Sequence, residues 1–262
     1  MNHIKGKIIA ITGASSGIGR TFACLAADHG ATPVLLARTA HALQELKEDL
    51  APKSPQTGSY RLDVTDEQQV CSVVEEIIAA YGQIDIWINN AGYGIFSAFT
   101  EADLNDFTGM MDVNYMGTVR CIKAVLPHML RRNTGHIVNV ASVAGKLPTP
   151  KSSGYSATKF AVLGFTNSLR QELNGTGVNI SSVNPGPVHT AFFERADTNG
   201  EYRRNIEKFM LTPEKVAQAM LDAIETNKAE ITVPRYMKLG ILVHQLFPSL
   251  FNRIIVPRIN KK

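Results

Sequence analysis

Short runs rich in valine and isoleucine alternate along the chain with longer segments whose apolar residues recur at helical spacing. Runs of the first kind predict strands, and the recurrence in the second kind predicts amphipathic helices. The predicted strands lie at residues 7–12, 33–37, 59–64, 84–89, 136–141, 179–184 and 230–233. The predicted helices lie at residues 17–29, 40–50, 66–81, 103–131, 154–173 and 213–227.

Strands that alternate with helices are typical of βα units, in which helices cover both faces of a parallel sheet. We find no linker or domain boundary, and a chain of 262 residues is long enough for one large α/β domain. Residues 51–58 are predicted to form a surface loop. The longest irregular stretch is 185–212, and a loop of that length in a compact domain is usually functional or mobile.

The composition is that of an ordinary globular protein, with 44% hydrophobic and 19% charged residues. The net charge of +4 comes from one end of the chain, because residues 235–262 hold six Lys or Arg and no Asp or Glu. Of the 27 Lys and Arg, 21 therefore lie elsewhere, against all 23 Asp and Glu. A body with that balance gives no indication of nucleic-acid binding.

The basic segment at 235–262 is also apolar. His244, Gln245 and Pro248 interrupt its apolar run well before the ~20 residues that a membrane-spanning helix needs. We treat the segment as an extension of the domain at 1–234. The body of the protein, another subunit or a membrane surface could cover it. We favour burial of residues 237–256 against protein, since an exposed run of this kind promotes aggregation.

The three cysteines, Cys24, Cys71 and Cys121, form no CxxC pair and no zinc-type cluster with histidine. We therefore expect no metal site, and we expect each cysteine to be a small buried hydrophobe in a reducing compartment. The first strand begins almost at the start of the chain, which leaves no room for a secretory signal. These features predict a cytoplasmic protein, with peripheral attachment to a membrane as the alternative.

The sequence TGASSGIG at 12–19 stands between the first predicted strand and the first predicted helix. Glycine lets the backbone turn sharply and approach a pyrophosphate, whose charge is favoured at a helix N-terminus. The spacing of Gly13, Gly17 and Gly19 differs from the common G-x-G-x-x-G, and glycine clusters also occur in plain turns. Its position in the first βα turn favours a dinucleotide site.

Tyr155 and Lys159 stand four residues apart near the start of a long predicted helix. Residues at this spacing are neighbours on one helix face, about 5–6 Å apart at Cβ. An isolated pair of this kind is usually an ordinary surface pair, so other parts of the chain must decide its meaning.

Six motifs together resemble the short-chain dehydrogenase/reductase family, in order and at family-like spacing between about residues 5 and 234. They are TGASSGIG at 12–19, NNAG at 89–92, Asn114 in VNYMG, Ser142 in NVAS, YSATK at 155–159 and PGPVHT at 185–190. The resemblance implies a single Rossmann-type, doubly wound α/β domain with a seven-stranded parallel sheet. It also implies reversible hydride transfer between a nicotinamide dinucleotide and an alcohol/carbonyl pair.

Four catalytic roles follow from the resemblance. Tyr155 would be the acid/base, Lys159 its partner and a holder of the nicotinamide ribose, and Ser142 the group that orients the carbonyl. Asn114 would hold a water that links Lys159 to a proton relay. A free tyrosine has a pKa of about 10. A nearby ammonium and an oxidised nicotinamide would lower that pKa toward the working pH.

The resemblance also implies the contacts of the cofactor. Gly13, Ser15, Gly17, Ile18 and Gly19 would cradle the pyrophosphate. Asp63, beside Val64 at the end of the third predicted strand, would accept from the adenine amino group. As an alternative, Asp63 could cap the next helix, where Thr65 is the better candidate. Asn90, Ala91 and Gly92 would line the adenine-ribose side, and Val188 and Thr190, after Pro185 and Gly186, would hold the carboxamide.

Arg38 follows the second predicted strand, at the place where an acidic residue would bind the ribose 2′-hydroxyl of NAD. A guanidinium instead suits the oxygens of a 2′-phosphate, and the Ser15 hydroxyl could add a hydrogen bond. We therefore expect a preference for NADP(H), with NAD(H) as the alternative cofactor. The alternative interpretation of Arg38 is a solvated arginine at a helix start.

The sequence leaves the substrate open among fatty-acyl, steroid, sphingoid and xenobiotic carbonyls. The candidate walls of its pocket are Tyr93, Ala144, Leu147, Phe192, Phe193, Phe209 and Met210. Phe192 and Phe193 could equally be ordinary packing; if they face the site, the substrate is apolar. A catalytically idle dinucleotide-binding sensor or scaffold is the rival function. The resemblance implies a homodimer or homotetramer.

Overall fold

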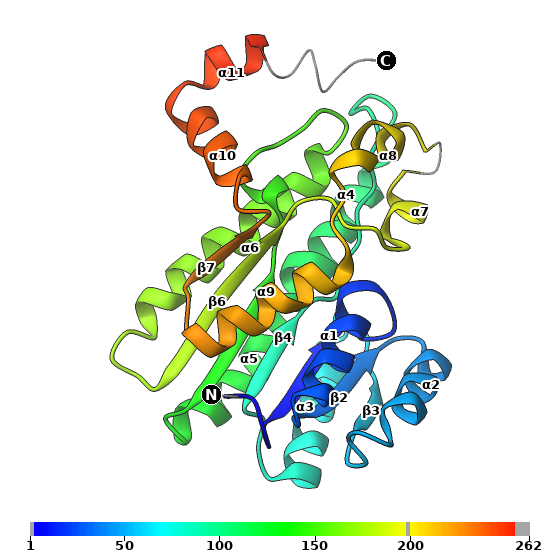
Figure 1. The fold of residues 1–262 in the computed structure, drawn as a ribbon, viewed down its shortest axis with the longest axis vertical. Helices are drawn as coiled ribbons and strands as arrows, with labels where there is room; N and C mark the ends of the chain where they lie inside the picture. Colours follow the sequence, from blue (N-terminus) through cyan, green and yellow to red (C-terminus); the bar gives the residue numbers. More distant parts are fainter. Residues whose placement is uncertain (1–2, 198–199, 255–262) are drawn as a thin grey trace.

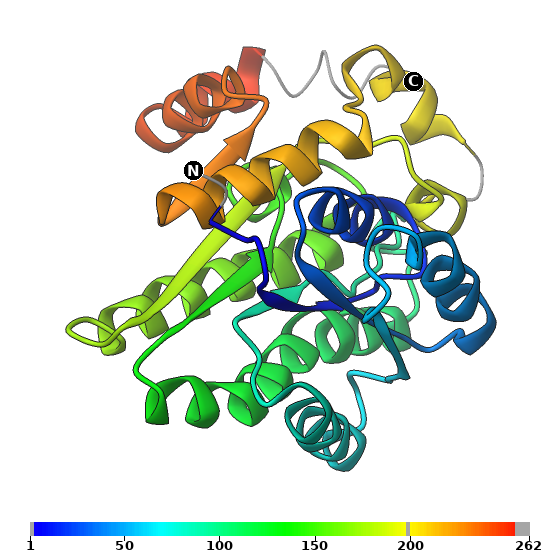
Figure 2. The same cartoon turned by 60° about the horizontal axis from the view of Figure 1, so that its bottom comes forward.

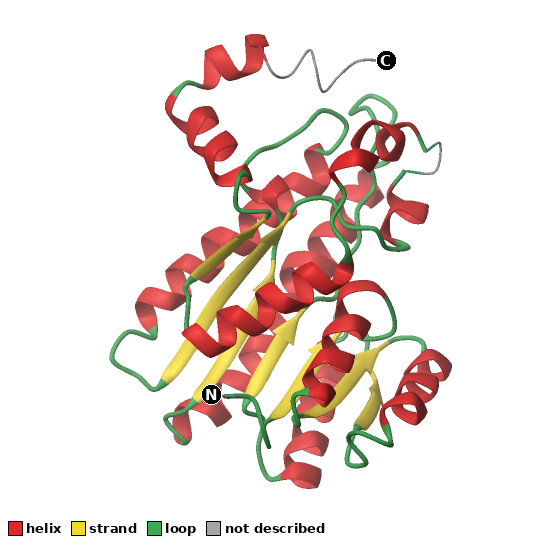
Figure 3. Ribbon diagram, in the orientation of Figure 1, coloured by secondary structure: helices red, strands yellow, loops and turns green. Residues whose placement is uncertain are grey.

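The computed structural model describes residues 3–197 and 200–254, and the described chain forms a seven-stranded parallel sheet (Figures 1 and 3). The strands are β1 (Ile8–Thr12), β2 (Thr32–Ala37), β3 (Gly58–Arg61), β4 (Ile86–Asn89), β5 (Gly135–Val140), β6 (Val178–Pro185) and β7 (Glu230–Val233). Their order in the sheet is β3-β2-β1-β4-β5-β6-β7. The predicted Rossmann-type fold is thus confirmed. The strand order reverses at β1, between β2 and β4, and a ligand crevice forms at such a point in open α/β sheets.

Helices cover both faces of the sheet (Figure 2). They are α1 (Gly17–Asp28), α2 (Ala40–Leu50), α3 (Glu67–Tyr81), α4 (Leu104–Met111), α5 (Gly117–Arg131), α6 (Ser153–Glu172), α7 (Phe192–Ala196), α8 (Glu201–Ile206), α9 (Pro213–Thr226), α10 (Met237–Leu246) and α11 (Pro248–Ile254). One buried apolar cluster joins the sheet to α1, α2 and α9, and a second joins it to α3, α5 and α6. Because both faces are covered, the central strands are apolar without alternation, and all six residues of β2 are buried.

The start of α3 corrects one capping assignment. The N-cap is Asp66, whose carboxylate accepts from the backbone N–H of Gln69 at 2.9 Å. Thr65 instead donates its backbone N–H and its hydroxyl to the Asp63 carboxylate, at 3.0 and 2.8 Å. The prediction that Thr65 caps the helix is therefore wrong, because Asp63 already engages it. Asp63 also lies beyond the end of β3, which stops at Arg61 rather than at residue 64.

The predicted helix at 103–131 is interrupted by a wider turn. Helix α4 ends at Met111, a π-helical turn spans Asp112–Met116, and α5 begins at Gly117. Such a turn re-aims the side chains within it and is frequent at functional sites. Here it carries the buried Asn114.

The cysteines do not share one environment. Cys121 is buried on α5, and burial raises the pKa of its thiol to about 12. Cys24 is half-buried, whereas Cys71 is exposed on α3, so the expectation that all three are buried is wrong. The reason is rotational: Val70, at the preceding position, faces the core, and the next residue on a helix points about 100° away.

Short helices occur both in the stretch at 185–212, which was predicted to be irregular, and in the apolar run at 237–256. Residues 185–212 hold α7, α8 and a 3-10 turn at Glu207–Phe209. Helix α10 packs Ile241 inward but exposes Leu239, Leu242 and Leu246, so the body of this chain does not cover the outward side of the run at 237–256. Burial of that side against another subunit stays a prediction. Residues 255–256 of that run lie outside the described residues. Within residues 3–197 and 200–254, no helix has both the length and the apolar character to cross a membrane.

A buried histidine links the neighbouring strands β5 and β6. Nε2 of His136 on β5 lies 2.8 Å from Oγ of Ser181 on β6, and this hydroxyl donates to the carbonyl of Lys228 at 2.7 Å. His136 therefore donates from Nε2 to Ser181. Burial lowers the pKa of the His136 imidazole to about 4.

We predict that acid destabilises the fold through His136. Its pKa falls from 6.5 in the unfolded chain to about 4, so its contribution is constant above pH 6.5 and stability is lost as the pH falls toward 4. At about 1.4 kcal/mol per pKa unit, the loss is about 3 kcal/mol by pH 4. His136→Gln keeps an N–H donor and does not titrate. Urea unfolding at pH 7 and pH 4 should show the stability difference between native protein and variant narrowing by this amount; a constant difference would refute the assignment.

Candidate active site

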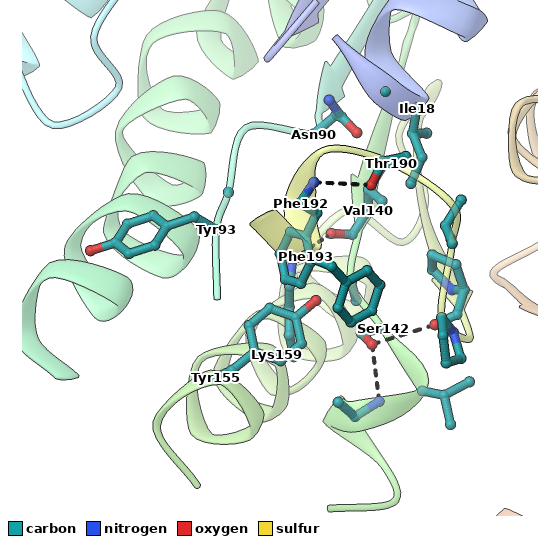
Figure 4. Close-up of a pocket in the computed structure, with 18 of the residues that line it drawn as sticks. Ile18, Asn90, Tyr93, Val140, Ser142, Tyr155, Lys159, Thr190, Phe192 and Phe193 are labelled. Atoms are coloured by element: carbon teal, nitrogen blue, oxygen red, sulfur yellow. Dashed lines mark hydrogen bonds between the residues drawn. The ribbon is translucent and has the colours of Figure 1, made fainter. Parts of the chain in front are cut away.

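A cavity of about 1220 Å³ opens at the carboxyl ends of the strands (Figure 4). Its lining runs from the turn between β1 and α1, past the ends of β2 and β4, to α6, the segment after β6, and α10. One continuous space therefore joins the predicted dinucleotide motifs to the Tyr–Lys pair. The size and the mixture of apolar walls with few polar groups are those of a cofactor and substrate site.

The glycine-rich turn leaves the N-terminus of α1 open to this cavity. Gly13 and Gly17 adopt φ values of +65° and +53°, which residues with a Cβ rarely adopt. The N-cap Ser16 makes no side-chain hydrogen bond to the helix, and the first turn of α1 holds no acidic residue. The first N–H groups of a helix have no acceptor within the helix and carry partial positive charge, so they can bind a phosphate. Ser15, Gly17 and Ile18 line the cavity.

Gly19 is the one residue of the predicted pyrophosphate cradle that does not line the cavity. A Cβ on Gly19 would collide with the carbonyl oxygen of Gly13 and would lie 2.6 Å from Nδ2 of Asn90. Gly19 therefore permits the close packing of α1 against the strand ends. Nδ2 of Asn90 donates to the carbonyls of Thr12 and Gly13, at 3.0 and 3.1 Å.

Arg38 and Asp63 stand together at the opposite end of the cavity from Tyr155. Arg38 is exposed just beyond β2, and Asp63, Val64, Ala91 and Gly92 also line the space. Burial works against the charged form of Asp63. The hydrogen bonds from Thr65 and the nearby Arg38 and Arg61 outweigh that effect and lower the pKa of the carboxyl.

The Tyr155 and Ser142 hydroxyls belong to one wall of the cavity (Figure 4). Ser142 follows β5; its Oγ accepts from the backbone N–H of Ala144 at 3.0 Å and donates to the carbonyl of Pro185 at 3.4 Å. Burial raises the pKa of Tyr155 to about 12, and a hydrogen bond with Ser142 only partly offsets it. This shift is opposite in direction to the lowering of the Tyr155 pKa that an oxidised nicotinamide would cause.

Lys159 is buried beneath the same wall. Its Nζ donates to the carbonyl of Val140 at 2.9 Å and lies 5.7 Å from the centroid of the Tyr155 ring. Burial lowers the pKa of Lys159 to about 8, so most of the ammonium remains charged at pH 7. The pair therefore shares one side of α6, as the spacing of four residues predicts.

Asn114 does not line the cavity, and its side chain is already engaged. Oδ1 accepts from the backbone N–H of Tyr93 at 2.9 Å, while Nδ2 donates to the Tyr93 carbonyl at 2.8 Å and to Oγ1 of Thr158 at 3.0 Å. A Cβ on Gly92 would lie 3.0 Å from Oδ1 of Asn114 and 3.8 Å from Nζ of Lys159. Asn114 thus clamps the loop after β4 to α6, next to Lys159.

The segment after β6 closes the far wall. Pro185, Gly186, Val188 and Thr190 all line the cavity. Oγ1 of Thr190 accepts from the backbone N–H of Phe192 at 3.3 Å, which holds the start of α7 over the site (Figure 4).

Six of the seven candidate wall residues line the cavity. Ala144, Leu147, Phe192, Phe193 and Phe209 line the cavity, whereas Met210 does not. Tyr93 borders the space, but its ring points away from it, under Arg195, whose guanidinium carbon lies 3.6 Å from the ring centroid (Figure 4). For Phe192, the pocket alternative holds: its ring packs at a centroid distance of 5.5 Å against Tyr155.

The sequence reasoning missed several wall residues. Phe96 packs edge-on against Tyr155 at a centroid distance of 5.7 Å and lies 4.6 Å from the ring of Tyr202. The place of Phe96 in the loop after β4 could have indicated it, since such loops meet the crevice. Tyr202 and the α10 residues carried no such signal, because only the folded chain brings them to the cavity.

Comparison with known proteins identifies the family. Residues 7–201 match the family model described as short chain dehydrogenase. An uncharacterised oxidoreductase of Staphylococcus saprophyticus is 38% identical over 238 residues, covering 89% of this chain and 99% of the relative. The chain therefore belongs to the short-chain dehydrogenase family, and the membership expected from its motifs is confirmed.

Solved structures agree with this fold. A short-chain dehydrogenase/reductase of Burkholderia phymatum in complex with NAD has a TM-score of 0.87 and 28% identity, over 95% of this chain and 96% of that one. An alcohol dehydrogenase of Thermococcus sibiricus complexed with 5-hydroxy-NADP has a TM-score of 0.78 and 26% identity, over 87% and 95%. The protein is thus an oxidoreductase of the short-chain dehydrogenase family. Of the two similar structures, one holds NAD and the other holds 5-hydroxy-NADP.

We predict that Gly19→Ala destabilises the protein by about 1–3 kcal/mol, because its methyl group has no room between Gly13 and Asn90. The control is Gly164→Ala on α6, where a Cβ has nothing within 4 Å and should be neutral or gain about 0.5–1 kcal/mol. Urea unfolding of both variants measures the difference. A Gly19→Ala protein as stable as the control would show that the packing is not tight.

Proposed function

We propose that the protein reduces an apolar carbonyl compound with NADPH, using Tyr155 as the proton donor. The observation that carries the proposal is the single cavity that joins the Tyr155 and Ser142 hydroxyls to the open N-terminus of α1. The first end suits a reacting carbonyl and the second suits a phosphate. A bound nicotinamide dinucleotide would supply the hydride.

Tyr155 acts as an acid in this proposal. With its pKa raised to about 12, the hydroxyl keeps its proton at neutral pH and can give it to the carbonyl oxygen as negative charge develops there. Ser142 turns its hydroxyl from the 3.4 Å contact with Pro185 toward the same oxygen and helps to fix its position. These two donors favour reduction over a site that only binds a dinucleotide.

Lys159 and Asn114 support that acid. The Lys159 ammonium lies under the Tyr155 ring and stabilises the phenolate left after proton transfer, and it would also hold the nicotinamide ribose. Asn114 acts as a positioning residue, since its three side-chain hydrogen bonds hold the loop after β4 against α6. A water next to its backbone would complete the relay expected from the family.

The remaining cofactor roles follow from position. Gly13, Ser15, Gly17 and Ile18 would hold the pyrophosphate, Asp63 and Val64 the adenine, Asn90, Ala91 and Gly92 the adenine-ribose side, and Pro185, Gly186, Val188 and Thr190 the carboxamide. Arg38 would read the 2′-phosphate of NADP, with Ser15 nearby.

The substrate end of the cavity supports an apolar substrate. Phe96, Phe192, Phe193 and Tyr202 form a connected group of rings around Tyr155. A carbonyl carried on a bulky apolar skeleton gains free energy by burial there. A simple sugar would leave these rings without matching surface.

We predict that Tyr155→Phe lowers kcat by about 10²–10⁴, because it keeps the ring but removes the proton donor. The measurement is NADPH oxidation across a panel of aldehydes, ketones and 3-oxoacyl compounds. Cofactor affinity should change little, whereas Lys159→Ala should lose both activity and affinity. The control Tyr202→Phe removes a hydroxyl from the same cavity and should cost much less. Retention of most activity by Tyr155→Phe would reject the role.

We predict that NADPH is preferred over NADH by about 10–100-fold, because a charge-assisted hydrogen bond contributes roughly 1.5–3 kcal/mol. Arg38→Ala should remove the preference, and Ala37→Asp with Arg38→Ile should reverse it. The control is Arg61→Ala, since Arg61 also lies near Asp63 but does not line the cavity. The measurement is kcat/KM for both cofactors on one substrate. Equal values in the native protein would show that Arg38 does not read the phosphate.

A further inference from the structure

Helix α10 carries an apolar stripe on its outward side. Tyr236, at its N-cap, and Leu239, Leu242, Val243 and Leu246 recur at intervals of three and four residues, so they share one side of the helix. Their exposure ranges from 37% to 67%. A surface helix normally presents polar residues to water. We call these five residues the α10 stripe.

The inward side of α10 fixes this orientation. Ile241 is buried, and the sulfur of Met237 lies 2.9 Å from the position of a Cβ on Gly186. Helix α10 is therefore fastened to the segment after β6 by one apolar side while the stripe faces outward. Figure 1 shows α10 and α11 standing at the end of the molecule beyond the carboxyl edge of the sheet.

The α10 stripe is continuous with the mouth of the cavity. Tyr236, Leu239 and Val243 both belong to the stripe and line the cavity. Phe209, from the turn after α8, also lines the cavity and is 59% exposed. The cavity thus opens between exposed apolar side chains. Surfaces of this kind mark interaction sites.

The charged residues of the segment that carries the stripe are all basic. Arg235, Lys238 and Arg253 are exposed on this segment, and residues 235–262 contain no acidic residue. A second copy docked on the same face would bring these cations together without a carboxylate of the segment to pair them. An anionic surface would instead be attracted to them.

We propose that α10 docks on the surface of an anionic phospholipid membrane, with the stripe among the acyl chains and Arg235 and Lys238 at the headgroups. A helix of ten residues lies in such an interface and does not cross it. Docking presents the cavity mouth to the lipid, so an apolar carbonyl compound enters from the bilayer. This last step rests on the proposed function, whereas docking does not.

The test is co-sedimentation of the full chain with vesicles of phosphatidylcholine, alone or mixed with phosphatidylserine. We expect binding to the mixed vesicles that weakens as salt is added. Leu242→Ser with Leu246→Ser changes two exposed stripe residues that do not line the cavity, and should weaken binding at least about tenfold. The control is Leu130→Ser, an exposed leucine near the end of α5, which should bind like the native protein.

Charge is tested separately by Lys238→Gln, which should weaken binding to mixed vesicles about fivefold. Failure of the native protein to bind mixed vesicles at low salt would overturn the proposal. So would a loss of self-association in Leu242→Ser with Leu246→Ser, seen by sedimentation velocity without vesicles, since the stripe would then join two copies.

Activity separates this proposal from the proposed function. A water-soluble aldehyde without vesicles should be reduced equally by the native protein and by Leu242→Ser with Leu246→Ser. Reduction of a long-chain ketone held in mixed vesicles should fall at least about tenfold in that variant. Vesicle binding without any carbonyl reduction would reject the enzyme function and leave docking intact. Equal reduction of the vesicle-held ketone by both proteins would overturn delivery from the lipid.

Discussion

The junction between the ends of β1 and β4 holds the site open. Oγ1 of Thr12 donates to the carbonyl of Ile88 at 3.1 Å and accepts from the backbone N–H groups of Asn90 and Ala91, at 2.9 and 3.0 Å. The side chain of Asn90 returns two hydrogen bonds to Thr12 and Gly13. Thr12 is almost fully buried, so these bonds are shielded from water. They fix the two strands at the point where the sheet reverses its order, and therefore fix the crevice.

Helix α6 depends on a second set of buried polar contacts. Nδ2 of Asn139 on β5 donates to Oγ1 of Thr166 at 2.8 Å, and Asn114 reaches Thr158 from the π-turn. A buried polar group that lacks its hydrogen-bond partner costs free energy, so the position of α6 against the sheet is well defined. Tyr155 and Lys159 lie on the first turns of this helix, so their positions are well defined too. Burial in this part of the fold favours the neutral form of both side chains, because it raises the pKa of Tyr155 and lowers the pKa of Lys159.

The cavity thus has two different ends, a crevice beside the strand ends and a mouth lined by apolar side chains. The phosphate end is built from backbone and small residues, which tolerate little change, as Gly19 illustrates. The proposed substrate end is built from α7, α8 and α10, short helices that lie beyond the carboxyl ends of the strands (Figure 1). Precision at the first end and apolar surface at the second are what the proposed hydride transfer to a hydrophobic carbonyl would require.

The sequence by itself determined the parallel α/β fold and about half of the cavity lining, because periodicity and short motifs are local properties of the chain. It also paired Tyr155 with Lys159, since helical spacing is local. The predictions that Cys71 is buried and that Thr65 caps a helix were wrong. A shift of one residue is enough to change the side of a helix on which a side chain lies, or the partner that a hydroxyl bonds. Only tertiary structure assigned Gly19 and Asn114 to packing and brought Phe96, Tyr202 and the α10 stripe to the cavity. Those contacts join segments far apart in sequence, and no local pattern specifies which of them meet.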